Sequence, residues 1–325
     1  MLLEAGQVFD KMNELGIRRQ AFVFGFDFAV ENGFICHPAL AYNIGLSFDF
    51  QGFGNILNVR HTKGFTEFRK YPVTQPEYEK SFSIVQRHLE AGNSYLVNLT
   101  FPTQIEVPAS LREIFLRSRA RYRLLFQDEF VVFSPEIFVR IENGIIRSFP
   151  MKGTIDASIP NAEREILNDF KEISEHNTIV DLIRNDLNMV ADDVKVDRFR
   201  YIEKINTNQK TLLQVSSQIS GNVPGDYRSN LGNIFRKLLP AGSISGAPKK
   251  RTLQIIKEAE TYERGFYTGV MGYFDGAKLD SGVMIRFIKK ENGKLYFYSG
   301  GGITVNSDMT TEYNELIDKV YVPVV

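Results

Sequence analysis

Two pairs of glutamates suggest metal chemistry. Glu172 and Glu175 are three residues apart, and Glu312 and Glu315 repeat that spacing near the end of the chain. On a helix, side chains at this spacing share a face, and like charges there destabilise the helix slightly. Two such pairs that converged could hold Mg²⁺, which prefers carboxylate oxygen ligands. A solvated helix face produces the same pattern, so the spacing leaves both interpretations open.

Two glycine-rich segments could bind an anion through backbone amides. The segment SGGGITVNSD, 299–308, places three glycines between an expected strand and an expected helix. The segment GSISGAPKK, 242–250, reads as a tight turn followed by a helix entry with two lysines. Exposed amides in such segments can hold a carboxylate or a phosphate, although simple tight turns use the same residues. Neither segment has the spacing of a nucleotide P-loop.

An arginine and a tyrosine lie in apolar surroundings. Arg286 is in SGVMIRFI, where we expect a strand, and a buried guanidinium needs an anion. That anion is either a carboxylate of the chain itself or a bound ligand. Tyr267, in GFYTG, is either a core residue with a satisfied hydroxyl group or a residue that binds a ligand.

Two further ionisable residues fall at expected bends. Glu136 in FSPEIF lies between two expected strands, where a carboxyl group is either a turn residue or, if partly desolvated, a general acid. Lys152 in FPMKGTID follows a strand that ends at a proline and precedes a Gly-Thr pair. It is either a solvated loop lysine or an amine that faces a pocket, and the local sequence does not decide between them.

The composition is that of an ordinary globular protein, because 43% of the 325 residues are hydrophobic and 24% are charged. Thirty-nine basic residues balance 39 acidic ones, which argues against nucleic acid or an anionic membrane as a partner. The single cysteine, Cys36, excludes an internal disulfide and fits a reducing cytoplasm. No apolar run approaches the roughly 18 residues of a membrane-spanning helix.

The elements that must position these residues read as hairpins with helices grouped between them. The Asn143-Gly144 pair predicts a hairpin turn, and Thr74 with Glu77 predicts a capped helix start. Expected strands cover 20–30, 95–101, 266–274, 280–289 and 294–299, expected hairpins cover 123–134 and 137–150, and residues 194–220 return to strands. Expected helices cover 75–91, 108–119, 160–190, 227–238, 247–259 and 308–319. This order predicts an α+β fold with antiparallel sheets in a single domain over 1–325.

Eight segments together resemble the chorismate-utilising enzymes, which include anthranilate, aminodeoxychorismate, isochorismate and salicylate synthases. They follow the family order between residues 134 and 319, as SPEIF, PMKGT, KEISEHNTIVDLIRNDL, LLPAGSISGAPK, RGFYTGVMGYF, MIRF, GGGITVNSD and EYNELIDK. The ordered set, rather than any one segment, carries the likeness. It implies antiparallel sheets sandwiched between helices, with a reduced N-terminal sheet region over about 1–73 and a catalytic core over 74–325.

The resemblance also implies a role for each matched residue. Mg²⁺ would be surrounded by the four glutamates named above, Glu172, Glu175, Glu312 and Glu315. The carboxylates of chorismate would be held by Tyr267, Arg286, Lys319 and the amides of Gly301 and Gly302. The ring of chorismate would be lined by Thr154 and Ala247, with Glu136 as the general acid at its 4-hydroxyl group.

Within the family, Lys152 distinguishes one reaction from the others. Anthranilate and isochorismate synthases carry alanine at the matching position, whereas aminodeoxychorismate synthases carry lysine. The resemblance implies that a neutral Lys152 amine attacks C2 of chorismate. Ammonia, from a separate glutamine amidotransferase or from solution, then gives 4-amino-4-deoxychorismate for para-aminobenzoate and folate. A lysine with the ordinary pKa of about 10.4 is charged at neutral pH, so burial or nearby positive charge must favour the neutral amine.

Three alternatives remain: an anthranilate synthase component I, an isochorismate or salicylate synthase, and a binding protein that keeps the fold without catalysis. Isochorismate and salicylate synthases use a lysine that activates water where this sequence has Leu96, which cannot act as a base. Gln214 stands where a histidine is common, so we assign it no catalytic role. The presence of Glu136 and Lys152 with the four glutamates argues against a protein without catalysis.

Overall fold

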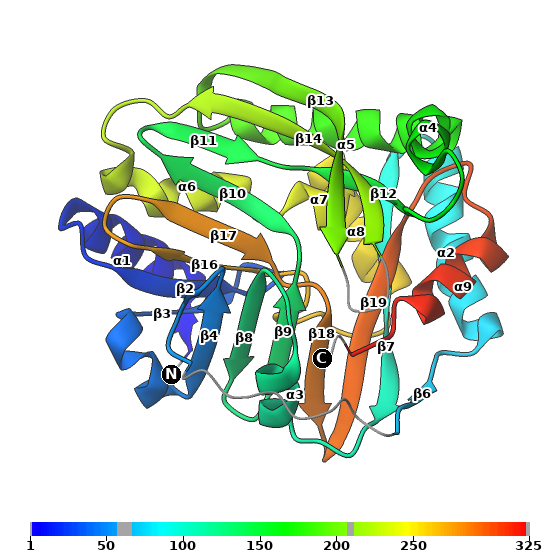
Figure 1. Cartoon of the computed structure of the whole chain (residues 1–325), viewed down its shortest axis with the longest axis horizontal. Helices are drawn as coiled ribbons and strands as arrows, with labels where there is room; N and C mark the ends of the chain where they lie inside the picture. Colours follow the sequence, from blue (N-terminus) through cyan, green and yellow to red (C-terminus); the bar gives the residue numbers. More distant parts are fainter. Residues whose placement is uncertain (1, 57–66, 207–210, 323–325) are drawn as a thin grey trace.

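Two antiparallel β-sheets pack against each other in the computed structural model, and helices cover both outer faces (Figure 1). The structure describes residues 2–56, 67–206 and 211–322. All the strand pairs in these ranges are antiparallel. The α+β fold with antiparallel sheets between helices is therefore confirmed.

Within the described ranges, the first sheet has ten strands and the second has nine. The first runs in the order β1 (Leu3–Glu4), β3 (Asn32–Cys36), β2 (Phe22–Phe26), β16 (Val270–Phe274), β17 (Leu279–Val283), β10 (Ile137–Glu142), β11 (Ile145–Ser148), β14 (Thr211–Asn222) and β12 (Met151–Asp156), with β13 (Asp192–Asn206) also paired to β14. The second runs in the order β15 (Gly246–Ala247), β7 (Leu96–Glu106), β19 (Lys294–Ile303), β18 (Phe287–Glu291), β9 (Phe130–Ser134), β8 (Tyr122–Phe126), β4 (Leu46–Phe50) and β5 (Phe53–Gly54), with β6 (Arg69–Tyr71) also paired to β7.

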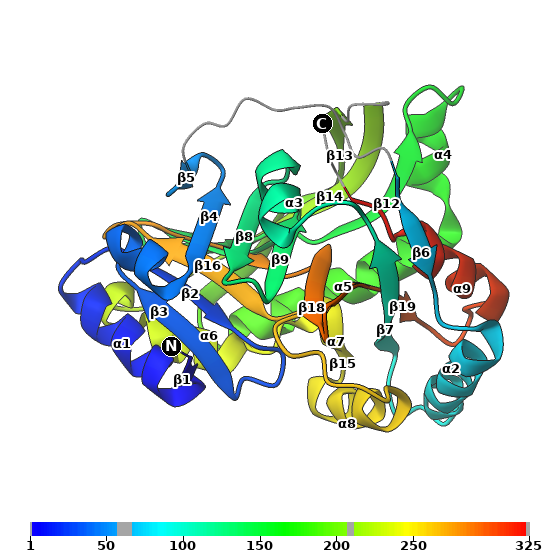
Figure 2. The same ribbon diagram turned by 90° about the horizontal axis from the view of Figure 1, so that it is seen from below.

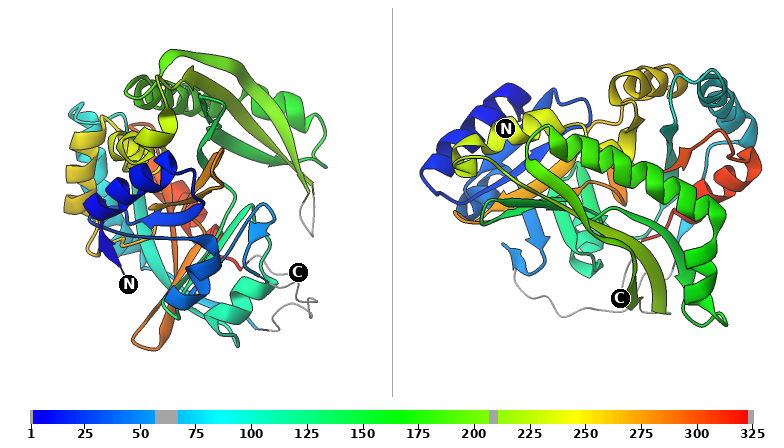
Figure 3. Two further views of the ribbon diagram at one scale, coloured as in Figure 1. Left: turned by 90° about the vertical axis from the view of Figure 1, so that its left-hand side faces the viewer. Right: turned by 90° about the horizontal axis from the view of Figure 1, so that it is seen from above.

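Helices form the two outer layers. The first sheet is covered by α1 (Ala5–Ile17), α5 (Phe170–Asn188) and α6 (Leu231–Leu238), and α5 lies along its outer face in the right-hand view of Figure 3. The second is covered by α2 (Gln75–Glu90), α3 (Leu111–Arg117), α8 (Lys249–Ala259) and α9 (Met309–Asp318). Figure 2 shows α2, α8 and α9 beside β7. The short helices are α4 (Ala162–Asn168) and α7 (Gly242–Ser245), with the 3₁₀ helices η1 (Pro38–Ile44) and η2 (Tyr227–Asn230).

Apolar side chains, many of them aromatic, fill the spaces between the layers. Between the sheets, Phe126 and Phe287 are buried with other side chains of both sheets. On the outer face of the first sheet, the Phe9 ring of α1 stacks on that of Phe26 with centroids 4.5 Å apart. On the outer face of the second, Val85 of α2 is buried against α8 and β7. Each such side chain contributes about 1.5–3 kcal/mol through burial, so these clusters hold the layers together.

Local signals predicted several boundaries well. Helix α2 begins after Thr74, which forms the capping box with Glu77, and the Thr74 N–H donates to the Glu77 carboxylate over 3.1 Å. Asn143 and Gly144 both have positive φ, at 52° and 73°, as a two-residue hairpin turn requires. No helix in the described ranges is long and apolar enough to cross a membrane.

Several expected elements differ from the structure. The expected helix over 160–190 is two helices, because Asp169 ends α4 and caps α5 by accepting a hydrogen bond from the Glu172 N–H over 2.9 Å. The expected strand over 280–289 is split between β17 and β18, which belong to different sheets. The glycines expected in a loop after residue 299 extend β19 to Ile303, because they pair with β7.

Candidate active site

Two neighbouring crossings between the sheets form one side of the candidate site. The chain passes from β9 to β10 at Glu136 and from β17 to β18 at Arg286. The crossings lie side by side, because β10 pairs with β17 and β9 pairs with β18. Two backbone hydrogen bonds of 3.1 Å join them, from Val283 N–H to the Glu136 carbonyl and from Phe133 N–H to the Arg286 carbonyl. The side chains of Glu136 and Arg286 are therefore brought together by strand pairing.

The predicted location of Arg286 inside a strand is wrong. Arg286 is partly exposed and has a φ of +54°, a left-handed conformation that is uncommon for residues with a Cβ. The cause is the crossing, where the chain must turn out of one sheet and into the other. The Arg286 Nε lies 3.4 Å from the hydroxyl oxygen of Tyr321. Strained backbone at such a position is typical of functional sites.

Glu136 has the environment of a proton donor. Its Oε1 accepts a hydrogen bond of 2.7 Å from the Ser243 hydroxyl group, on α7. Burial raises the pKa of the Glu136 carboxyl group, and the opposing effects of the Ser243 hydrogen bond and the Arg286 charge do not cancel this rise. A carboxyl group that keeps its proton closer to neutral pH suits a general acid. Ser243 was not predicted, although its hydroxyl group lies in the singled-out segment 242–250.

Tyr267 lies at the same end of the site, just before β16. Its ring is buried, and its centroid is 5.2 Å from that of Tyr298. Burial raises the pKa of Tyr267, and nearby charges also act on it, first those of Arg264 and Glu260 and then those of Arg286 and Glu136. The phenol therefore remains protonated at neutral pH and can donate a hydrogen bond.

A β-bulge directs Lys152 toward α5. The pairing of β12 with β14 changes register between Met151 and Thr154, and Gly153 has a φ of +84°. A Cβ at Gly153 would lie 2.9 Å from the Glu172 Oε2, so glycine allows both the bend and the close approach of the helix. The Lys152 Nζ lies 2.5 Å from the Glu175 Oε2. The bend at residues 150–154 thus brings an amine to the glutamates.

Charged groups around Lys152 act on its pKa. Burial lowers its pKa, but the negative charges of Glu175, Glu172 and Glu315 together raise it above the ordinary lysine value. The reason is that the carboxylates predicted to hold Mg²⁺ surround the amine itself. Glutamates of both α5 and α9 therefore act on the same amine.

Helix α5 is anchored to the first sheet next to its glutamates. His176 follows Glu175 and is completely buried, with its Nε2 2.7 Å from the Ser217 hydroxyl oxygen on β14. Burial lowers the pKa of His176 to about 4, so the ring is neutral at physiological pH. This contact holds the face of α5 that carries Glu175 against the sheet.

Helix α9 presents the second pair of glutamates. It begins after Asp308, whose carboxylate accepts a hydrogen bond from the Thr311 N–H over 2.9 Å. Glu312 is buried and accepts a hydrogen bond of 2.8 Å from the Ser307 hydroxyl group. Glu315, one turn later, lies 2.7 Å from the Lys319 Nζ through its Oε1.

Lys319 connects α9 to the glycines of β19. Its Nζ donates to the Gly300 carbonyl over 2.8 Å, and a Cβ on Gly301 would lie 3.7 Å from that Nζ and 3.3 Å from the Glu312 Oε2. Burial lowers the pKa of Lys319; the charges of Lys152 and Arg286 lower it further, whereas Glu315 acts in the opposite direction. Both lysines, Arg286 and the glutamates therefore share one region.

The remaining predicted residues lie on strands. Gly301 and Gly302 pair with Leu99 and Asn98 of β7, so the expected exposed loop is instead a strand. In the described ranges, β18 pairs with β19 only at residues 294–298 of β19. The backbone edge of Gly301 and Gly302 that faces away from β7 is therefore unpaired in these ranges. Ala247, on the short strand β15, pairs with Leu96 of β7. Thr154 is exposed on β12, two residues after Lys152.

The donor chemistry of the glutamates fits a hard divalent cation. Carboxylates from α5 and α9 act on one amine, and carboxylate oxygens are the ligands that Mg²⁺ prefers. Across residues 2–56, 67–206 and 211–322, no group of three or more histidine, cysteine, aspartate or glutamate side chains forms a ready-made metal site. Lys152 and Lys319 form ion pairs with Glu175 and Glu315 in this arrangement.

The raised pKa of Glu136 predicts an effect on stability. Between the ordinary glutamate pKa and the raised one, the folded protein binds more protons than the unfolded chain, so stability is full below the ordinary pKa and falls as pH rises. Glu136→Gln removes this loss and keeps an acceptor for Ser243. We expect its Tm to exceed that of wild type by about 2 °C or more at about pH 7.5, and to match it at about pH 4.

Thermal melts at the two pH values check this expectation. Glu79→Gln is the matched control, because Glu79 is exposed on α2. The control should leave the Tm unchanged at both pH values. The same change in Tm at both pH values for Glu136→Gln would contradict a raised pKa.

Comparison with known proteins places the chain in a family. Residues 56–324 match the model of chorismate binding enzymes. An uncharacterised PabA-like protein of Pasteurella multocida is 49% identical over 315 residues, which cover 96% of this chain and 97% of that protein. Aminodeoxychorismate synthase component 1 of Salmonella typhimurium is 33% identical over 263 residues, 76% of this chain and 57% of that protein. Anthranilate synthase component 1 of Pseudomonas aeruginosa is 34% identical over 263 residues, 76% of this chain and 52% of that protein.

The fold agrees with this assignment. The menaquinone-specific isochorismate synthase MenF of Escherichia coli has a TM-score of 0.70 to this chain at 16% identity, over 97% of this chain and 80% of that protein. At that identity the likeness concerns the fold alone. The family resemblance predicted from eight sequence segments is confirmed by the matched model and by the relatives. This chain belongs to the chorismate binding enzyme family.

Proposed function

We propose that this chain is component I of an aminodeoxychorismate synthase. It aminates chorismate with ammonia to 4-amino-4-deoxychorismate, in the presence of Mg²⁺, for para-aminobenzoate and folate synthesis in the cytoplasm. The observation that supports this most is Lys152, which a β-bulge directs to the glutamates of α5 and α9. Membership of the chorismate binding family supports the substrate.

Lys152 is the proposed nucleophile and Glu136 the proposed acid. The neutral Nζ forms a bond to C2 of chorismate, both ring double bonds shift toward C4, and the C4–O bond breaks so that the 4-hydroxyl group leaves as water with a proton from Glu136. The resulting secondary ammonium group is then the leaving group. Ammonia bonds to C4, both ring double bonds shift back, and the C2–N bond breaks so that Lys152 leaves as a neutral amine while the product carries the ammonium group.

The charge around Lys152 decides when it can react. Its raised pKa depends on Glu175, Glu172 and Glu315, so compensation of their charge lowers that pKa and releases the neutral amine. Glu172, Glu175, Glu312 and Glu315 are the residues that would hold Mg²⁺. When bound, Mg²⁺ supplies positive charge and a Lewis acid that anchors a carboxylate of chorismate.

Other residues of the site would bind the rest of chorismate. Positive charge for its carboxylates comes from Arg286 and Lys319, and hydrogen bonds come from Tyr267 and the amides of Gly301 and Gly302. Thr154 and Ala247 would lie along the ring. The ammonia would come from a separate glutamine amidotransferase subunit or from solution.

Anthranilate synthase component I is the second candidate, because a relative with that name is as similar in sequence as the aminodeoxychorismate synthase. Lys152 argues against it, since the anthranilate enzymes resemble this sequence there but carry alanine. An isochorismate or salicylate synthase would need a base where this chain has Leu96, which is apolar. The Leu96 side chain packs close to Gly302, where an added Cβ would lie 2.9 Å from it.

Replacement of Lys152 should abolish a covalent intermediate. Intact-mass spectrometry of the protein with chorismate and Mg²⁺, without ammonium, should detect an adduct of chorismate minus one water. Lys152→Ala should remove both the adduct and the formation of aminodeoxychorismate. Lys250→Ala, at an exposed lysine of α8, is the matched control and should keep both. An adduct that persists in Lys152→Ala would exclude Lys152 as the nucleophile.

Replacement of a buried glutamate should weaken Mg²⁺ binding. We choose Glu312→Gln because Glu312 can be changed without touching the ion pair between Lys152 and Glu175. Its Mg²⁺ affinity, measured by calorimetry with chorismate present, should fall by about tenfold or more. Glu163→Gln, at an exposed glutamate of α4, should bind Mg²⁺ like wild type. An unchanged affinity in Glu312→Gln would remove Glu312 from the metal site.

A further inference from the structure

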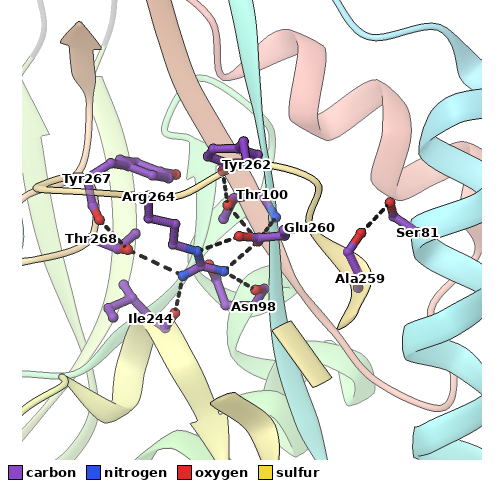
Figure 4. Close-up of polar contacts among 10 residues, drawn as sticks. All are labelled: Ser81, Asn98, Thr100, Ile244, Ala259, Glu260, Tyr262, Arg264, Tyr267 and Thr268. Carbon is purple, nitrogen blue, oxygen red and sulfur yellow. Dashed lines mark hydrogen bonds and ion pairs between the residues drawn. The ribbon is translucent and has the colours of Figure 1, made fainter. Parts of the chain in front are cut away.

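A buried ion pair lies behind the candidate site and belongs to none of the roles assigned above. Glu260 follows the last residue of α8, and Arg264 precedes the turn that carries Tyr267; they are 8% and 3% exposed. Arg264 donates through Nε to the Glu260 Oε2 over 2.8 Å and through Nη2 to the Glu260 Oε1 over 2.7 Å. Figure 4 shows this pair between β7, α7 and the Tyr267 turn.

Arg264 also binds three separate parts of the chain (Figure 4). Its Nη2 donates to the Asn98 carbonyl on β7 over 2.6 Å, and its Nη1 donates to the Ile244 carbonyl on α7 over 3.0 Å. Nη1 also donates to the Thr268 hydroxyl oxygen over 3.3 Å. With the two bonds to Glu260, these contacts use all five N–H groups of a guanidinium.

Each of these three partners adjoins a residue of the site. Asn98 pairs with Gly302 on β19, and Ile244 follows Ser243, which donates to Glu136. Thr268 follows Tyr267 and donates its hydroxyl hydrogen to the Tyr267 carbonyl over 2.6 Å. The Arg264 guanidinium group is therefore linked through one intervening residue to each of three parts of the site. These parts are the glycines of β19, the Ser243–Glu136 hydrogen bond and Tyr267.

The turn beside Arg264 is held in a strained conformation. Thr268 has a φ of +60°, which is rare for a β-branched residue and persists only where the surroundings enforce it. The Thr268 N–H donates to the Met284 carbonyl over 2.8 Å, which ties the turn to the crossing at Arg286. The hydrogen bond from Arg264 is a second constraint on the same residue.

Glu260 is itself fixed from other directions. Its Oε1 accepts from the Thr100 N–H over 2.9 Å and from the Thr100 hydroxyl group over 2.7 Å. Because that hydroxyl hydrogen is used, the Tyr262 hydroxyl group is the donor in its 2.5 Å contact with Thr100. The Ser81 hydroxyl group of α2 donates to the carbonyl of Ala259, just before Glu260 (Figure 4).

We propose that Arg264 is a positioning residue that fixes β7, α7 and the Tyr267 turn relative to one another. Stability alone is a weak reason for such a pair, because desolvation of two buried charges offsets much of their attraction. The planar fork of arginine matches the five acceptor directions, which lysine, with three donors at one point, does not. The role rests on the chorismate site but not on which nucleophile reacts there.

The test replaces Arg264 by lysine, which keeps the charge opposite Glu260 and loses the fork. Chorismate binding is measured by calorimetry with Mg²⁺ and without ammonium, so the outcome does not depend on the amination reaction. We expect Arg264→Lys to weaken chorismate binding by about tenfold, as the loss of one or two buried hydrogen bonds predicts. Arg87→Lys is the matched control, because Arg87 forms an exposed ion pair of 3.0 Å with Glu258, and should bind normally.

A second measurement separates positioning from loss of stability. The pKa of Glu136 is measured by NMR on protein with ¹³C-labelled glutamate carboxyl groups, assigned with Glu136→Gln. If Arg264 holds α7 in place, Arg264→Lys weakens the hydrogen bond from Ser243 and raises the pKa of Glu136. Arg286 and Tyr267 also interact with this carboxyl group, so both residues are left unchanged in every variant. A lower Tm with unchanged chorismate affinity and unchanged Glu136 pKa would overturn the proposal.

A pair of variants at Thr268 keeps the proposal testable if Arg264→Lys does not fold. Thr268→Ser keeps the hydroxyl group and Thr268→Ala removes it, whereas both relieve the strain of a branched side chain. We expect Thr268→Ala to weaken chorismate binding by up to about tenfold and Thr268→Ser to bind like wild type. Equal affinities of the two variants would contradict the proposed link from Arg264 to Tyr267.

Discussion

The site depends on two segments of the chain that pass from one sheet to the other side by side. Strands β9 and β18 pair in one sheet, and their continuations β10 and β17 pair in the other. The chain must leave one sheet and enter the other at each crossing, and at the second crossing Arg286 takes a left-handed conformation. Glu136 and Arg286 are consequently neighbours, and the remaining site residues are arranged around this point.

Electrostatic balance is the second constraint on the site. Glutamates of α5 and α9 act on Lys152, while Lys152 and Arg286 act on Lys319. These opposite charges are kept close by secondary structure rather than by mutual attraction alone, since α5 is anchored through His176 and β12 is bent at Gly153. A change of charge at one group therefore alters the protonation of the others.

Local signals in the sequence predicted the local features of the fold. The Asn143-Gly144 turn forms because both residues tolerate positive φ, whatever surrounds them. The split of the expected strand at Arg286 depends on which sheet each half joins, and that is set by pairing with distant strands. The Glu260–Arg264 pair looks like a helical i, i+4 pair, but α8 ends before it. The glutamate pairs alone leave two interpretations open, and only the ordered family segments favour the one with Mg²⁺.

The identity of the product tests the proposed amination most directly. Wild-type protein is incubated with chorismate, Mg²⁺ and ammonium, and the products are separated by chromatography. We expect 4-amino-4-deoxychorismate, and no product when Mg²⁺ is removed by a chelator. Anthranilate, isochorismate or salicylate as the product would contradict the amination through Lys152, and chorismate binding without turnover would contradict an enzymatic role.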